Sequence, residues 1–256
     1  MIKAAFFDVD GTLLSHRTKS VPNSARDAIA KLQAQGIKCV VATGRQIGQF
    51  RKLPVGDISF DGYITLNGQL TLDAQQKRLY GTPIEGKAKE YCIKLFEENR
   101  MPALLVEEDR VYLNFVNQRV RDVQEIISTP VPALGQYTGK EIYQVCVYLN
   151  EEEVHQVGAI AEECSLARWG FGGVDIIAKG GGKVEGIRKY LEREGIAVEQ
   201  TIAFGDADND REMLQFAGIG VAMGNADEKV KAAADYVTAD VDDDGIAKAL
   251  RHFGLI

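Results

Sequence analysis

Short apolar runs alternate with amphipathic stretches over most of this chain. Ile2 to Phe7 is almost entirely apolar, which is typical of a strand buried on both faces of a parallel sheet. Pro22 to Gln35 carries its apolar residues on one helical stripe and predicts a helix. Ile37 to Ala42 and Tyr63 to Leu66 predict two further strands. Strand, helix and strand with short links form a right-handed βαβ unit of a parallel sheet.

The same alternation returns near residue 183 and predicts the second half of that sheet. In order, the predicted elements are a helix at Lys183–Glu194, a strand at Thr201–Phe204, a helix at Arg211–Phe216, a strand at Ile219–Ala222 and a helix at Asp227–Ala234.

Residues 84–178 have a different texture. Three stretches there are predicted to be helices, at Lys87–Glu98, Val120–Ile127 and Glu153–Glu163. They are mixed with strands in which apolar residues alternate with polar ones, at Val111–Phe115 and Tyr143–Leu149. We therefore predict an α/β protein in which residues 1–83 and 179–256 form a Rossmann-like parallel sheet. Residues 84–178 are predicted to be an inserted α+β domain. Its two connections, near Pro83 and Lys179, would form a hinge that lets it open and close over the sheet.

The composition narrows the classes of partner. The chain has 256 residues, of which 45% are hydrophobic, and no apolar run is long enough to span a bilayer. A net charge of −7 argues against nucleic acid or an anionic membrane as a partner. The four cysteines are scattered, and Cys39 and Cys146 are predicted to be core residues of strands. Met1 leads directly into the first predicted strand, so we expect no signal peptide. We expect a cytoplasmic protein, whose oligomeric state the sequence leaves open.

Two acids end the first predicted strand, in Asp8-Val9-Asp10-Gly11-Thr12. Carboxylates at the edge of a dry core are costly unless a metal or a cationic ligand compensates them. Alternation along an extended chain lets Asp8 and Asp10 face the same side. Gly11 permits a sharp turn, and Thr12 can bond the freed backbone groups. Ligands of open α/β sheets bind at the carboxyl ends of strands, so the pair is a candidate site. An Asx-type turn is the alternative.

Thr43-Gly44-Arg45 follows the second predicted strand and precedes a short helix. A helix N-terminus offers unpaired amides and a partial positive charge, which suit a phosphate. Thr43 with Gln46 also fits a capping box. The two roles are compatible, because a capping threonine can also face a ligand.

Lys183 begins a predicted helix after three consecutive glycines. A lysine at this position can hold a phosphoryl group and neutralise a carboxylate. The Walker pattern G-x-x-x-x-G-K-S/T is absent. The alternative is a solvated surface lysine, and Lys179 is a rival for the same role.

Asp206, Asp208 and Asp210 crowd together directly after an apolar strand. Their mutual repulsion is commonly relieved by a bound cation. The longer spacing and distal Glu of an EF-hand are missing. The alternative is that Asp208 simply caps the next helix.

Together these clusters resemble the haloacid dehalogenase-like (HAD) superfamily, and within it the Cof-type phosphatases with a C2B cap. The likeness covers the whole chain and rests on Asp8-Val9-Asp10-Gly11-Thr12-Leu13-Leu14, Ala42-Thr43-Gly44-Arg45, Lys183 and Gly205-Asp206-x-x-Asn209-Asp210, with Leu66-Asn67-Gly68 and Asp244-Gly245-Ile246 beside them. The interval between Asp8 and Thr43 holds one crossover helix and no cap, so residues 84–178 would be the cap.

The resemblance implies a role for each matched residue. Asp8 would attack phosphorus in line and form an aspartyl-phosphate. Asp10 would protonate the leaving oxygen and then take a proton from the hydrolytic water. Mg2+ would be held by the carboxylates of Asp8 and Asp206 and by the backbone carbonyl of Asp10. The phosphate site would comprise Thr43, Gly44, Lys183 and Asn209, with Asp210 in support.

We therefore expect a Mg2+-dependent phosphatase whose partner is a small phosphorylated molecule, such as a sugar phosphate or a phosphorylated cofactor. A phosphomannomutase-like phosphotransferase shares this cap type and is one alternative. The other is a non-enzymatic phospho-acceptor or binding protein resembling response-regulator receivers, which the large insert and Asp10 oppose.

A few other residues have two interpretations. His16 is either a surface histidine or a substrate contact. Asn67-Gly68 is a hairpin-turn signal, and it matches a segment that lies near the site in the family. Arg168, Trp169 and Phe171 are candidate contacts to the leaving group, although packing in the cap core is the simpler role for Trp169.

Overall fold

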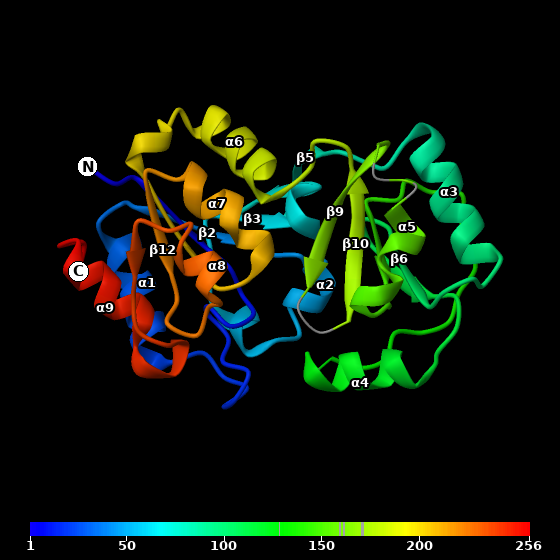
Figure 1. Cartoon of the computed structure of the whole chain (residues 1–256). Coiled ribbons are helices and arrows are strands. Elements are labelled where there is room, and N and C mark those ends of the chain that lie inside the picture. The colour runs from blue at the N-terminus through cyan, green and yellow to red at the C-terminus, as the bar shows by residue number, and fades with distance from the viewer. Residues whose placement is uncertain (128, 159, 161, 170–171) are drawn as a thin grey trace. The chain divides into compact units, whose positions relative to one another are not determined.

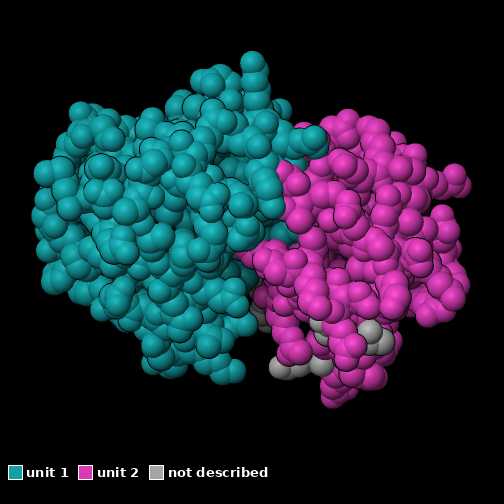
Figure 2. Space-filling view, turned by 90° about the horizontal axis from the view of Figure 1, so that it is seen from above, with its two compact units in different colours: residues 1–80, 183–256 teal, residues 81–182 magenta. Residues whose placement is uncertain are grey.

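The computed structural model describes residues 1–127, 129–158, 160, 162–169 and 172–256. It divides into two compact units (Figure 2). Unit 1 comprises residues 1–80 and 183–256, and unit 2 comprises residues 81–182. The predicted boundaries of core and insert lie a few residues away, at 83/84 and 178/179. Each unit contains its own β-sheet.

Unit 1 contains a mostly parallel sheet flanked by helices (Figure 1). Its strand order is β13-β12-β11-β1-β2-β3-β4-β5. Neighbours from β13 to β3 are parallel, and β4 pairs antiparallel to β3. The predicted α/β class with a parallel sheet is therefore confirmed. The strands are β1 (Ala4–Phe7), β2 (Lys38–Ala42), β3 (Gly62–Thr65), β4 (Leu70–Asp73), β5 (Arg78–Gly81), β11 (Thr201–Gly205), β12 (Ile219–Ala222) and β13 (Tyr236–Val237).

Strand β1 lies at the centre of this sheet and is buried on both faces, as its apolar run predicts. Phe6 meets the ring of Tyr190 edge-on at 6.2 Å, whereas Phe7 stacks on Phe204 at 5.1 Å on the other face. Because successive side chains of a strand point to opposite faces, aromatic packing supports both faces of β1. The carboxyl end of β1 is therefore held firmly.

Helices cover both faces of the sheet of unit 1. The Cys39 Sγ of β2 lies 3.8 Å from the Ile29 carbonyl of helix α1 (Asn23–Ala34), which lies beside α9 (Gly245–His252). Val40, the next residue of β2, belongs to the core cluster on the face covered by α6 (Lys183–Glu194) and α7 (Arg211–Phe216). This layering places the start of α6 at the edge where β1 ends.

Unit 2 contains an antiparallel sheet with the order β7-β6-β8-β10-β9. Helix α3 contributes Cys92, Leu95 and Phe96 to the core cluster of this unit. Cys146 of β8 is buried, as Cys39 is in β2, so both predictions of core cysteines in strands are confirmed. The elements are α3 (Gly86–Glu97), β6 (Ala103–Val106), β7 (Val111–Leu113), α4 (Gln118–Ile126), β8 (Gln144–Val147), α5 (His155–Gly158), β9 (Cys164–Trp169) and β10 (Gly173–Ala178).

Two predicted helices are shorter in the part of the chain that the structure describes. The helix predicted at Asp227–Ala234 is α8 (Glu228–Lys231), because the chain must turn to pair β13 with β12, and the Asp235 carboxylate fastens that turn to the Gly220 amide. The helix predicted at Glu153–Glu163 is represented by α5 (His155–Gly158). Residues 159 and 161 lie outside the described part.

The Asn67-Gly68 hairpin signal is confirmed, because residues Leu66–Gly68 connect β3 to the antiparallel β4. The capping box predicted at Thr43 and Gln46 is wrong in position. Helix α2 (Ile47–Phe50) is capped by Gln46, whose side chain accepts from the Gly48 amide while Gln49 reaches back to the Gln46 amide. Within the described residues, no helix is both long and apolar enough to cross a membrane.

Candidate active site

Every residue to which the family resemblance assigns a catalytic, metal-binding or phosphate-binding role lies in unit 1. Asp8 follows β1, and Lys183 is the first residue of α6. The Lys183 Nζ donates to the Asp8 Oδ1 and to the Asp210 Oδ1, each at 2.6 Å. Its side chain is only 1% exposed, so the interpretation as a solvated surface lysine is wrong. Lys179 belongs to unit 2, where its Nζ donates to the carbonyl of Glu162.

Helix α6 approaches the sheet closely at Gly186. A Cβ at this position would lie 2.5 Å from the Ile64 Cγ2 and 3.0 Å from the Gly68 Cα. Glycine therefore permits a contact between helix and sheet that a larger residue would push apart. The start of the helix, with Lys183, is held over the end of β1 by this contact.

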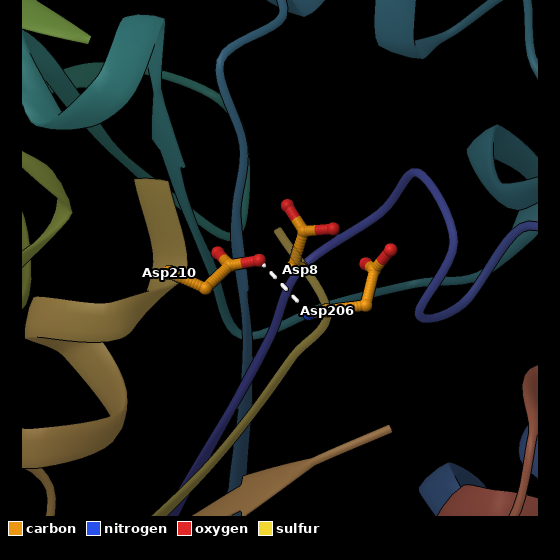
Figure 3. Close-up of side chains that lie close together, drawn as sticks. All are labelled: Asp8, Asp206 and Asp210. Atoms are coloured by element: carbon orange, nitrogen blue, oxygen red, sulfur yellow. Dashed lines mark hydrogen bonds between the residues drawn. The ribbon is translucent and has the colours of Figure 1, made fainter. Parts of the chain in front are cut away.

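The loop after β11 folds around the Asp210 carboxylate. Its Oδ2 accepts from the amide of Asp206 at 3.0 Å (Figure 3). It also accepts from the amide of Ala207 at 3.0 Å. Asp208 turns away and accepts from Arg211 Nη1, and no side-chain bond caps α7. The alternative of Asp208 as a helix cap is therefore wrong.

The first turn of the chain closes directly against Asp206. Thr12 Oγ1 donates to Asp206 Oδ1 at 2.8 Å rather than bonding backbone groups of its own turn. Gly11 has a φ of +86°, and a Cβ there would lie 2.1 Å from Asp206 Oδ2. Only glycine combines this conformation with this approach.

Oxygens of Asp8, Asp206 and Asp210 lie within 4.8 Å of one another, and Figure 3 shows the three side chains side by side. Burial, together with repulsion from Asp210, raises the pKa of Asp8 from 3.8 to about 7, although Lys183 opposes the shift. Burial and the charges of Asp8 and Asp210 raise the pKa of Asp206 well above its usual value. Burial opposes the charge on Lys183, but Asp210 and Asp8 outweigh it and raise its pKa.

This donor set fits a hard divalent cation. Three carboxylates face a single lysine, so negative charge is left over, and oxygen ligands are those that Mg2+ prefers. Both Asp210 oxygens are engaged by Lys183 and by the loop amides. Asp8 and Asp206 are therefore better placed as ligands, and Asp210 as the residue that shapes the loop. The predicted contribution of Asp10 comes from its backbone carbonyl and stays a prediction.

The Thr43 turn is joined to the rest of the site through Asn67. The backbone N–H of Asn67 donates to the Thr43 carbonyl at 3.1 Å. The Asn67 side-chain Oδ1 accepts from Asn209 Nδ2 at 3.2 Å. A Cβ on Gly44 would meet the Asn67 side chain at 3.2 Å. Asn67 is buried in a left-handed conformation (φ 51°). Asn67-Gly68 thus forms the turn of a hairpin, and Asn67 also connects the Thr43 turn to Asn209.

Two residues had no role assigned from the sequence. Arg45 forms a two-point ion pair with Asp10, with Nε–Oδ2 at 2.6 Å and Nη2–Oδ1 at 2.7 Å. Asn225 Nδ2 donates to the Gly11 carbonyl at 2.8 Å and lies 3.4 Å from Asp206 Oδ2. Asn225 closely follows β12, so the rule that ligands gather at the carboxyl ends of strands could have found it.

The remaining candidates are His16, Arg168, Trp169 and Phe171. His16 is exposed. Trp169 meets the Tyr148 ring edge-on at 5.6 Å within unit 2, which fits its expected packing role. Arg168 lies in β9 of unit 2, and Phe171 lies outside the described residues.

Residues 5–250 match the family model of haloacid dehalogenase-like hydrolases. The chain belongs to this family. Of the solved structures it resembles, the HAD subclass IIB sugar phosphatase BT4131 is 36% identical, with a TM-score of 0.89 over 99% of this chain and 100% of that one. The predicted superfamily and its Cof-type subgroup are confirmed, and the chain is a phosphatase of the HAD type.

Two relatives from Bacillus subtilis (strain 168) extend the comparison across the full chain. YkrA is 35% identical over 99% of this chain and 98% of its own length. The 5-amino-6-(5-phospho-D-ribitylamino)uracil phosphatase YitU is 30% identical over 96% of this chain and 95% of its own length.

Proposed function

We propose that this phosphatase hydrolyses phosphate monoesters of small metabolites in a Mg2+-dependent reaction that passes through an aspartyl-phosphate on Asp8. The observation that carries the proposal is the buried contact of Asp8 with Lys183 at 2.6 Å, beside the carboxylates of Asp206 and Asp210. A nucleophilic carboxylate and a phosphate repel each other, so their approach needs positive charge in place beforehand.

The chain supplies part of this charge itself. Lys183 is held between Asp8 and Asp210, and the Asp210 carboxylate in turn fastens the loop that carries Asp206. Asp8 and Asp206, with the carbonyl of Asp10, would hold Mg2+, which would offset the charge of the phosphoryl oxygens. Thr43, the Gly44 amide and Asn209 complete the proposed phosphate site. Their connection through Asn67 keeps them in one place.

Asp10 is the proposed acid and base. In the first step an Asp8 oxygen bonds to phosphorus, the bond from phosphorus to the leaving oxygen breaks, and a proton from Asp10 converts that oxygen to an alcohol. In the second step water attacks phosphorus, Asp10 takes its proton, and Asp8 and inorganic phosphate separate. General acid–base catalysis of this kind typically contributes about 10²–10⁴ in rate.

Sugar phosphates and phosphorylated cofactors are the proposed substrates. The sugar-phosphatase name of BT4131 supports the first class, and the name of YitU shows that a relative acts on another small phosphorylated metabolite, 5-amino-6-(5-phospho-D-ribitylamino)uracil. Both are small monoesters, in keeping with a site built around one phosphoryl group.

Phosphate release from a panel of such monoesters tests the proposal. With Mg2+ we expect turnover of p-nitrophenyl phosphate and of at least one metabolite, and loss of both with EDTA or in Asp8→Asn. Glu212→Gln is the matched control, because Glu212 is exposed on α7. Full activity in Asp8→Asn would refute the nucleophile. Transfer between two positions of a sugar without net hydrolysis would favour a phosphotransferase.

A further inference from the structure

The ion pair between Arg45 and Asp10 occupies both oxygens of the proposed acid and base. Arg45 Nε meets Asp10 Oδ2 at 2.6 Å, and Nη2 meets Oδ1 at 2.7 Å. The Arg45 side chain is 9% exposed and that of Asp10 is 27% exposed. A planar guanidinium that binds at two points fixes the plane of the carboxylate as well as its position.

Arg45 is itself anchored to the turn that forms the proposed phosphate site. Its amide donates to Thr43 Oγ1 at 3.2 Å, and its carbonyl accepts from the Leu66 amide at 3.3 Å. Burial opposes the charge on Arg45, but the carboxylates of Asp10 and Asp8 outweigh it and raise its pKa. The guanidinium is therefore a fixed positive charge between the phosphate turn and Asp10.

We propose that Arg45 is a positioning residue, which orients Asp10 for its two proton transfers. The inference rests on the proposed function, in which Asp10 is the acid and base. The contact of Arg45 with one Asp10 oxygen holds the carboxyl group in place while the other oxygen passes its proton to the leaving oxygen. After that proton has passed to the leaving oxygen, Asp10 is a carboxylate again. The two-point pair seen here then re-forms and holds it for the water of the second step.

Leaving groups separate this role from simple phosphate binding. p-Nitrophenolate departs without a proton near neutral pH, whereas the alkoxide of glycerol 2-phosphate needs one. Replacing a residue that acts through Asp10 should therefore lower kcat/KM far more for the alkyl ester than for p-nitrophenyl phosphate. A residue that binds the phosphoryl group matters equally for both esters, because they share that group.

The experiment measures kcat/KM with Mg2+ for both esters in Asp10→Asn, Arg45→Gln, Arg45→Lys and the double variant Asp10→Asn/Arg45→Gln. We expect Arg45→Gln to lose about 100-fold on glycerol 2-phosphate and only a few-fold on p-nitrophenyl phosphate. In the double variant we expect little loss beyond that of Asp10→Asn, because the two residues act as one unit. Arg45→Lys retains one contact and should recover part of the alkyl activity.

Arg26→Gln is the matched control. Arg26 forms an ion pair with Asp57 in the same unit, and its loss should leave both activities near the parent values. Equal losses on the two esters in Arg45→Gln, additive with Asp10→Asn, would overturn the inference and assign Arg45 to phosphate binding. If Arg45→Gln does not fold by circular dichroism, the ratio of the two activities in Arg45→Lys decides by the same criterion.

Different results would refute the proposed function itself. Asp10→Asn would then keep its alkyl-phosphatase activity, or Asp8→Asn would keep activity on both esters. Both of these results come from variants that keep Arg45, so they test the proposed function independently of the role of Arg45. A selective loss on the alkyl ester in Asp10→Asn but not in Arg45→Gln would overturn the role of Arg45 alone.

Discussion

At the scale of single residues, the site is a set of buried charges that depend on one another. Asp8 and Asp210 are both buried, and Lys183 lies between them. Removing one partner of a buried pair leaves the other charge without compensation, which costs far more than losing a surface pair.

Lys183→Met therefore should destabilise the fold as well as abolish turnover. We expect the free energy of unfolding to fall by about 3–5 kcal/mol, measured by urea denaturation without Mg2+. Lys189→Met, at a partly exposed pair in the same helix, should cost about 1 kcal/mol or less. Equal losses in the two variants would contradict the buried triad.

At the scale of elements, close contacts between backbones place the functional side chains. Helix α6 begins at Lys183, and its approach to the β3–β4 connection at Gly186 sets where that lysine points. The turn after β1 depends on Gly11 in the same way.

Gly186→Ala should push α6 away from Ile64. Overpacking of this kind costs about 1–3 kcal/mol, and we expect a lower melting temperature together with a lower kcat as Lys183 moves. Gly158→Ala is the control, because nothing lies within 4 Å of a Cβ at that position in α5. An unchanged melting temperature in Gly186→Ala would show that the helix can shift freely.

At the scale of the whole molecule, stability and cation binding are linked through the acidic cluster. Burial first, and then Asp210, raise the pKa of Asp8 from 3.8 to about 7 in the fold. The metal-free folded chain therefore holds a proton that the unfolded chain releases at lower pH. Its free energy of unfolding falls as the pH rises from about 4 to about 7.

Mg2+ should therefore stabilise the protein more at higher pH. Its carboxylate ligands must be deprotonated, so the rise in melting temperature on adding Mg2+ to EDTA-treated protein should be larger at about pH 7.5 than at about pH 5.5. Thermal unfolding at both pH values measures this difference. Equal rises at the two pH values would contradict a cation held by Asp8 and Asp206.

Much of the fold and of the candidate site could be predicted from the sequence, because the causes of these features are local. The apolar run of β1, the helical stripe of α1 and the acids after β1 and β11 are readable from spacing alone. The length of α8 could not be predicted in this way, because the pairing of β13 with β12 ends the helix early. The capping box moved to Gln46 because the Thr43 hydroxyl accepts from the Arg45 amide.

The sequence by itself determined the parallel sheet and the family, because buried strands, turns and acidic motifs leave their signatures within a few neighbouring residues. It also identified Lys183 and Asp206 as candidates. Only the tertiary structure decided that Lys183 lies between Asp8 and Asp210, that Asn67 joins the Thr43 turn to Asn209, and that Arg45 holds Asp10. These pairings connect residues far apart in the chain, and they arise from the order of the strands and the approach of α6 rather than from spacing along the sequence.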